Sequence, residues 1–133
     1  MVDEAAGAHR ALQHWISGAA DGDWSQLIGM LDPEVAFSVP VDGFHGNRRG
    51  RSEASRFFAH LAEAVRAELT PTSTLVQGDR VAFEVSVRGR WLERPFQQAL
   101  CLVFVVREGR IIEFREYLAW PGGLDPDQPP RQD

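Results

Sequence analysis

Apolar residues in the first half of the chain recur at the spacing of helices. In two stretches before residue 32 they fall every three or four positions, as in helices that bury one face. Asp3 and Asp23 stand where they can cap these helices, and the Asp21-Gly22 pair ends the first of them. The same spacing returns over residues 50–67, which predicts a third helix with Ser52 as its cap.

A short strand and a loop are predicted between the second and third helices. The Asp32-Pro33 pair closes the second helix, because a residue before proline disfavours helical geometry. The segment EVAFSVP that follows has the composition of a strand. The next segment, VDGFHGNRRG, is polar and rich in glycine, which predicts an irregular loop.

After Thr70-Pro71 apolar and polar residues alternate with the period of strands. The alternation predicts strands over residues 73–77, 80–91, 96–107 and 110–119, with tight hairpin turns at Gly78-Asp79 and Glu108-Gly109. The face predicted to meet the helices includes Val81, Phe83, Val85 and Val87. Helices followed by an antiparallel sheet indicate an α+β fold.

The third of these strands, QQALCLVFVV, is apolar on both faces. The helices can cover one face, so the other face needs a different cover. The simplest cover is a second copy of the chain, and we therefore expect a homodimer formed through the sheet.

Length and charge narrow the classes of function. A chain of 133 residues, 44% of them hydrophobic, fits one domain; we place it at residues 1–120 and expect residues 121–133 to form a flexible tail. The formal charge of -5 argues against nucleic acid or an anionic membrane as partner. The sequence shows neither a basic leader nor an apolar run of about 20 residues, which predicts a cytoplasmic protein. Because Cys101 is the only cysteine, no internal disulfide is expected.

The last predicted strand carries a carboxylate among apolar residues. One face of the segment EGRIIEFREYLAW is formed by its even positions, Ile112, Phe114, Glu116, Leu118 and Trp120. Burial of an unpaired carboxylate is costly unless it is protonated, so Glu116 needs a role. One interpretation is a general acid or base with a raised pKa. The other is an ion pair with an arginine.

The order of elements, with DGDWSQLIGMLDPEVAFSVP early and REGRIIEFREYL late, resembles the nuclear transport factor 2-like superfamily, especially its SnoaL-like and ketosteroid isomerase-like branches. The resemblance covers residues 3–120. It implies a cone-shaped α+β barrel in which a curved, mainly antiparallel sheet wraps around three N-terminal helices. It also implies an apolar pocket open at one end, usually in a dimer.

The resemblance separates this chain from the true ketosteroid isomerases. Their donor tyrosine falls on Trp15, their aspartate base on Val39 and their protonated aspartate on Cys101, so ketosteroid isomerisation is not expected. SnoaL-like cyclases and limonene epoxide hydrolases instead carry an acidic residue at the position of Glu116. The arginine and aspartate of the hydrolase fall on valines, one of them Val85, so its three-residue arrangement is absent.

These comparisons give a predicted site. Glu116 is the expected proton-transfer residue, Trp15 can orient a substrate oxygen, and Asp42 and His45 in the loop can share proton transfer. A solvated turn is the alternative for the two loop residues. The expected substrate-binding residues are Trp24, Val39, Phe58, Phe83, Val85, Cys101, Phe114 and Leu118.

Two further features are weaker indications. Arg48, Arg49 and Arg51 suit either an anion site at the start of the third helix or a solvated loop. No His, Asp or Glu residues have the spacing of metal ligands, so neither a metal nor another cofactor is expected.

The sequence as a whole predicts a small cofactor-independent enzyme that acts on an apolar polyketide-like or terpenoid-like molecule. Its acid–base reaction would be a cyclisation, isomerisation, dehydration or epoxide opening. A noncatalytic small-molecule-binding or dimerisation module of the same fold is the main alternative. A third hypothesis is an adaptor that binds a protein partner through the sheet.

Overall fold

The computed structural model describes residues 4–119. The helices are α1 (Glu4–Asp21), α2 (Ser25–Met30) and α3 (Arg51–Ala64). The strands are β1 (Leu31–Ser38), β2 (Arg48–Arg49), β3 (Val65–Gln77), β4 (Arg80–Trp91), β5 (Arg94–Arg107) and β6 (Arg110–Leu118). They form one sheet in the order β2-β1-β6-β5-β4-β3, and every pair is antiparallel except β1 with β6. The predicted α+β fold is confirmed.

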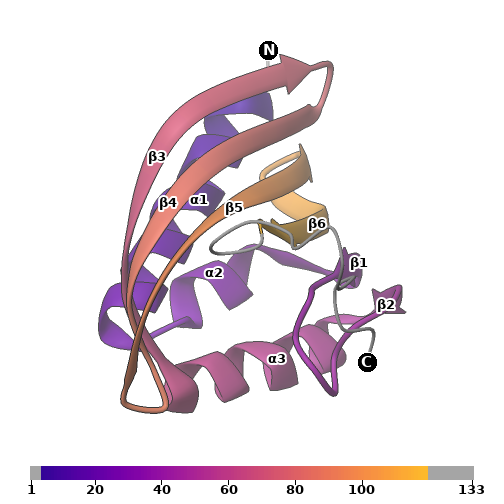
Figure 1. Cartoon of the computed structure of the whole chain (residues 1–133). Coiled ribbons are helices and arrows are strands. Elements are labelled where there is room, and N and C mark those ends of the chain that lie inside the picture. Colours follow the sequence, from indigo (N-terminus) through magenta and orange to yellow (C-terminus); the bar gives the residue numbers. More distant parts are fainter. Residues whose placement is uncertain (1–3, 120–133) are drawn as a thin grey trace, which may run out of the picture.

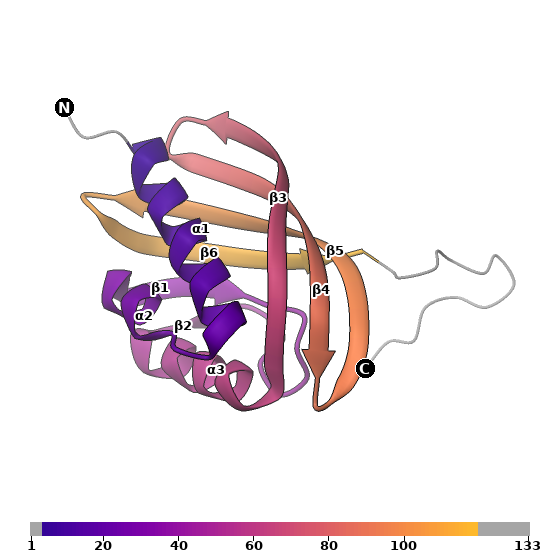
Figure 2. The ribbon, with the colours of Figure 1, turned by 90° about the vertical axis from the view of Figure 1, so that its left-hand side faces the viewer.

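The sheet bends around the helices. Figure 1 shows the long strands β3, β4 and β5 arching over α1, while α3 lies across the opposite side of the concavity. In Figure 2 α1 crosses the inside of the curved sheet. We call the side of the sheet that points toward α1 and α3 the inward face, and the other side the outer face. The curvature leaves room for one apolar core between the inward face and the helices.

The inward face of β4 is the one that the sequence predicted. Its buried side chains are Val81, Phe83, Val85 and Val87. The alternate residues Glu84, Ser86 and Arg88 are exposed on the outer face. Period-two alternation therefore assigned the two faces of this strand correctly.

Three predicted element boundaries are wrong. Asp32-Pro33 lies inside β1 instead of closing α2, and Pro33 is tolerated there because the register of β1 against β6 is irregular between Leu31 and Ala36. The third helix ends at Ala64 instead of residue 67. The strand predicted over residues 73–77 already begins at Val65, because pairing with β4 begins there.

The start of α3 also differs from the prediction. Ser52 is not its cap; the cap residue is Gly50, which has no side chain to donate or accept and adopts a φ of 107°. That φ lies in the region that favours glycine. The backbone carbonyl of Gly50 accepts the first helical hydrogen bond, from the N–H of Ala54 at 3.0 Å.

Within the described residues, no helix has both the length and the apolar character needed to cross a bilayer. The predicted domain boundary at residue 120 and the predicted tail over residues 121–133 lie outside the described residues.

Candidate functional site

Glu116 lies on the inward face of β6. The register of β5 and β6 sets Phe114 opposite Phe104 and Glu116 opposite Leu102. Because Phe114, Phe104 and Leu102 are all buried, the side chain of Glu116 is directed to the same side of the sheet. A register irregularity earlier in β6 buries Ile111 in place of the predicted Ile112. The other predicted member of this face, Trp120, lies outside the described residues.

The carboxyl group of Glu116 has apolar neighbours and no partner. Leu102 lies across from it, and Phe114 and Leu118 flank it on its own strand. None of the hydrogen bonds or ion pairs among the described residues involves Glu116. Part of the residue's surface remains accessible, but loss of hydration raises the pKa of Glu116 to about 7. The ion-pair interpretation from the sequence therefore finds no partner in this part of the chain.

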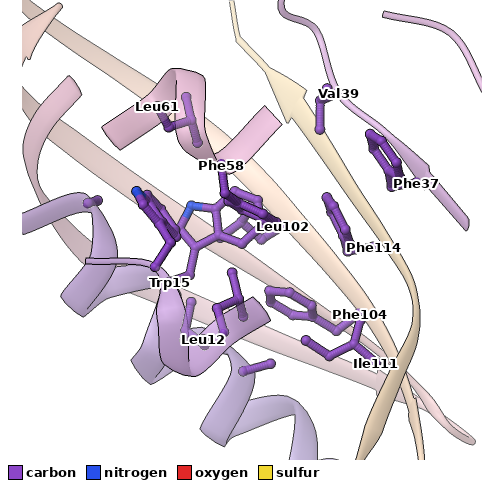
Figure 3. Packing of buried hydrophobic residues seen from close by; sticks show 14 of the residues in the cluster. Leu12, Trp15, Phe37, Val39, Phe58, Leu61, Leu102, Phe104, Ile111 and Phe114 are labelled. Carbon is purple, nitrogen blue, oxygen red and sulfur yellow. The ribbon is translucent and has the colours of Figure 1, made fainter. Parts of the chain in front are cut away.

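Trp15 lies deep among aromatic rings. It is 3% exposed and makes edge contacts with the rings of Trp24, Phe58, Phe104 and Phe114, with centroid distances of 5.6, 5.3, 5.9 and 5.8 Å. Figure 3 shows Trp15, Phe58, Phe104 and Phe114 converging from the helices and the sheet. The indole N–H of Trp24 is buried without a hydrogen-bond partner among the described residues. Aromatic packing thus occupies the interior that the sequence analysis assigned to a pocket.

The predicted substrate-binding residues fall into three groups. Most are buried in this core: Trp24, Val39, Phe58, Phe83, Val85 and Phe114. Leu118 is 42% exposed at the end of β6, on the same face as Glu116. Cys101 is on the outer face, because its neighbours Leu100 and Leu102 are the buried residues of β5. Leu102, and not Cys101, therefore takes the inward position opposite Glu116.

Cys101 is also a poor nucleophile in this setting. Partial burial and the nearby carboxylate of Glu84 raise the pKa of its thiol. Thiol reactivity requires the thiolate form, which such surroundings disfavour.

No hydrogen bond or ion pair joins Asp42 or His45 to Glu116 within the described part of the chain. Both are exposed in the loop between β1 and β2. Their side chains make no hydrogen bond or ion pair with the described residues, whereas the loop backbone forms a turn in which the N–H of Phe44 donates to the carbonyl of Val41 at 2.9 Å. This geometry favours the solvated-turn interpretation.

The three arginines near that loop donate to backbone carbonyls, Arg48 to those of the loop and Arg49 and Arg51 to those of β1. Arg48 donates to the carbonyl of Gly43 at 3.1 Å and to that of His45 at 3.3 Å. Arg49 donates to the carbonyl of Glu34 and Arg51 to that of Leu31, each at 3.3 Å. Their guanidinium groups therefore stabilise the backbone around the start of α3.

In residues 4–119 no cluster of three or more His, Cys, Asp or Glu side chains is arranged to hold a metal ion.

Two cavities lie mainly on the outer face of the sheet, the face on which the sequence analysis expects a second copy of the chain. The first, of about 440 Å³, is lined by Leu75, Val76, Gln77, Arg80, Ala82, Val103, Arg115 and Tyr117. The second, of about 380 Å³, shares Tyr117 and includes Glu84 and Cys101. They make the outer face a candidate for an interface.

Comparisons with known proteins agree with this architecture. An NTF2-like protein from Anabaena variabilis ATCC 29413 has a TM-score of 0.85 to this chain at 26% identity, over 92% of this chain and 96% of that chain. A candidate isomerase from Bacillus subtilis has a TM-score of 0.78 at 21% identity, over 89% and 90% of the chains. An LEH-like epoxide hydrolase from M. tuberculosis has a TM-score of 0.69 at 20% identity, over 86% and 84%.

The last two similarities establish the fold alone. A search of curated proteins gave no significant match. The family model of the SnoaL-like domain, however, matches residues 12–114, most of the chain. This match confirms the resemblance found in the sequence. The protein belongs to the SnoaL-like domain family within the NTF2-like fold.

Proposed function

We propose that this protein is a small acid–base enzyme in which Glu116 transfers a proton to or from an apolar small molecule. One observation carries the proposal. The carboxyl group lies on an otherwise apolar stretch of the inward face, without a partner among the described residues, and its pKa is raised to about 7. Perturbed carboxyl groups of this kind are concentrated at functional sites.

A pKa of about 7 lets Glu116 act in both directions at neutral pH. The protonated and ionised forms are then present in comparable amounts, so the group can act as general acid or as general base. One positioned acid or base contributes roughly 10² to 10⁴ in rate. The reaction is therefore one of an already activated substrate: a cyclisation, isomerisation, dehydration or epoxide opening.

The surroundings of Glu116 indicate the kind of substrate. Its neighbours Leu102, Phe114 and Leu118 offer apolar contact, which suits a polyketide-like or terpenoid-like body. Leu118 is the most accessible of the three, at 42% exposed. We therefore place substrate entry at the end of β6, away from the packed rings around Trp15.

Glu116→Gln tests the catalytic role, because glutamine keeps the shape of the side chain and cannot titrate. On a panel of apolar epoxides, enones and polyketide-like ketones, the variant should lose at least about 100-fold in turnover while ligand affinity stays within about threefold. The kcat/KM of the unchanged protein should vary around pH 7. Glu113→Gln is the matched control, since Glu113 is on the same strand but bonded to Arg80 and Arg115. Full turnover by Glu116→Gln would exclude Glu116 as the catalyst.

The dense packing around Trp15 favours a second candidate function, a noncatalytic module that binds a small molecule near the end of β6. Trp15 and Val39 are each 3% exposed, so two of the positions that match catalytic residues of ketosteroid isomerases contribute to packing here. The same panel separates the two functions. A binding module would retain ligands without converting them, and Glu116→Gln would then change affinity alone.

We also propose that two copies of the chain associate through the outer face of the sheet. Tyr117 and Leu75 are 51% and 66% exposed there, beside the small side chain of Ala82. The same face carries the cation Arg115 and the anion Glu84. A two-fold interface places one patch against itself, so a patch with both signs of charge can pair with its own copy.

A further inference from the structure

A second polar residue interrupts the inward face of the sheet. Gln98 pairs with Val87, which is 3% exposed, and alternates with Leu100, which is 9% exposed. The amide side chain of Gln98 is therefore directed to the inward face. On β4, β5 and β6 the other side chains of this face include Val81, Phe83, Val85, Val87, Trp91, Phe96, Leu100, Leu102, Phe104, Phe114, Glu116 and Leu118. Arg94, opposite Trp91, is exposed at the hairpin end of the face. Away from the hairpin, Glu116 and Gln98 are the polar residues that interrupt this apolar set.

The amide of Gln98 has unused hydrogen-bonding capacity. The residue is half-buried, and no described residue forms a hydrogen bond with its side chain. A primary amide offers two donors and one acceptor oxygen, and burying them without partners is unfavourable. Its neighbour Gln97 differs, because it is exposed on the outer face opposite Arg88. Gln97 points into solvent, whereas Gln98 lies against an apolar face and is still reached by solvent, since its amide is not among the buried unpaired polar atoms of the described residues.

Aromatic rings border Gln98 on the side toward the β4–β5 hairpin. Phe96 is two residues away on the same face and lies 6.3 Å from the ring of Trp91. The ring of Trp91 lies near that of His60 of α3, with centroids 6.2 Å apart. The ring of His60 in turn lies near that of Phe44, with centroids 5.7 Å apart. All four rings are partly exposed, unlike the sealed rings around Trp15. They form a continuous aromatic edge that a flat apolar molecule can contact.

The separation of Gln98 from Glu116 suits a molecule of several fused rings. Glu116 lies opposite Leu102, and Gln98 is four residues from Leu102 along β5. At about 3.3 Å per residue this corresponds to about 13 Å along the strand. A molecule held at both ends therefore needs the length of two or three fused rings.

From this arrangement we infer that Gln98 is a specificity-determining residue, which binds a neutral oxygen at the end of the substrate remote from Glu116. This inference rests on the proposed function in one respect: the reacting end of the substrate lies at Glu116. The amide can donate to a carbonyl oxygen or accept from a hydroxyl group. The ring body lies against Phe96 and Trp91. The substrate class is a planar, fused-ring molecule with a carbonyl or hydroxyl group at its far end.

The test compares two probes that differ in one hydrogen-bonding group, 2-naphthol and 2-methylnaphthalene. Gln98→Met removes the amide while keeping an unbranched side chain, and Gln97→Met is the matched control on the outer face. We expect Gln98→Met to weaken 2-naphthol binding about fivefold to tenfold, the usual effect of one lost hydrogen bond. Binding of 2-methylnaphthalene should not change. Gln97→Met should leave both affinities as they were.

The side-chain amide signals of the two glutamines give a second reading. In ¹⁵N-labelled protein, assigned with the two methionine variants, 2-naphthol should shift the NH₂ signals of Gln98 and leave those of Gln97 in place. Unmoved Gln98 signals, equal 2-naphthol affinity in Gln98→Met, or no binding up to the solubility of 2-naphthol would each overturn the inference. The titration is repeated in Glu116→Gln, where the Gln98 response should persist. A lost catalytic role for Glu116 is thereby distinguished from a failure of the Gln98 site.

Discussion

The unpaired carboxyl of Glu116 predicts a specific dependence of stability on pH. Burial raises its pKa from 4.5 to about 7, whereas in the unfolded chain the group titrates near its ordinary value. The folded state therefore holds the proton more tightly than the unfolded state. The resulting stability is fully present below about pH 4.5 and is lost as the pH rises through about 7.

The magnitude follows from the same two values. Each pKa unit corresponds to about 1.4 kcal/mol, so a rise from 4.5 to about 7 makes ionised Glu116 cost the fold about 3 kcal/mol. Glu116→Gln removes this titration. We expect the free energy of unfolding of Glu116→Gln, relative to that of the unchanged protein, to rise by about 2.5 kcal/mol between pH 5 and pH 8, because part of the full difference is already lost at pH 5.

Urea unfolding at pH 5, 6, 7 and 8, followed by tryptophan fluorescence, measures this difference because Trp15 and Trp24 are buried. Protein concentration is kept constant so that any association contributes equally. Glu113→Gln is the control. Partial burial opposes ionisation of Glu113, but hydrogen bonds from Arg115 and Arg80 outweigh it and hold the pKa of this carboxyl below its ordinary value. Its contribution is lost only as the pH falls toward the acidic range, so its difference from the unchanged protein should be constant from pH 5 to 8.

Parallel stability curves for the unchanged protein and Glu116→Gln would refute the reasoning. They would mean that water or a partner solvates the carboxylate as well in the folded protein as in the unfolded chain. The proposed general acid–base role would then lose the observation that supports it.

Three further predictions concern packing, assembly and the loop. Gly18→Ala should lower the free energy of unfolding, measured in urea, by about 1–3 kcal/mol, because the new Cβ would lie 2.5 Å from the ring of Trp24. Gly29→Ala is the control: its new Cβ would have no atom within 4 Å, so this variant should be as stable as the unchanged protein or more stable. Val103→Arg should yield monomers in sedimentation velocity if the outer face forms the homodimer, and a monomeric unchanged protein would contradict that proposal. Asp42→Asn and His45→Gln should each leave turnover within about twofold, and a larger loss would return these loop residues to the site.

The sequence predicted the parts of the fold that depend on period alone. The buried face of β4 and the position of Glu116 both follow from alternation, which is a local property of an extended chain. Helix and strand patterns overlap where α3 ends, since Val65 fits the apolar face of the helix as well as it fits β3. Pairing with β4 decides that boundary. Pairing between distant segments cannot be predicted from a local pattern of residues.

The site was harder to predict than the fold. Cys101 was assigned to the pocket because of a family position, but the register of β5 directs it outward and puts Leu102 inward. Gln98 had a usable signal that was missed. Its position in alternation with Leu100 and Leu102 places a polar side chain on the face toward the helices, by the argument that singled out Glu116.

The positions of Glu116 and Gln98 separate the scaffold of this protein from its proposed site. A face that served packing alone would be more stable with apolar side chains at both positions, because neither polar group has a partner among residues 4–119 and one of them loses its hydration. Both residues are half-buried, whereas Trp15 and Phe58 are sealed in the core. The free-energy cost of these two unpaired polar groups is therefore confined to the accessible ends of β5 and β6. There a ligand can supply the hydrogen bonds that the protein does not. An apolar molecule with one reacting centre and one distant oxygen would satisfy both residues, and this connects the proton chemistry at Glu116 to the specificity at Gln98.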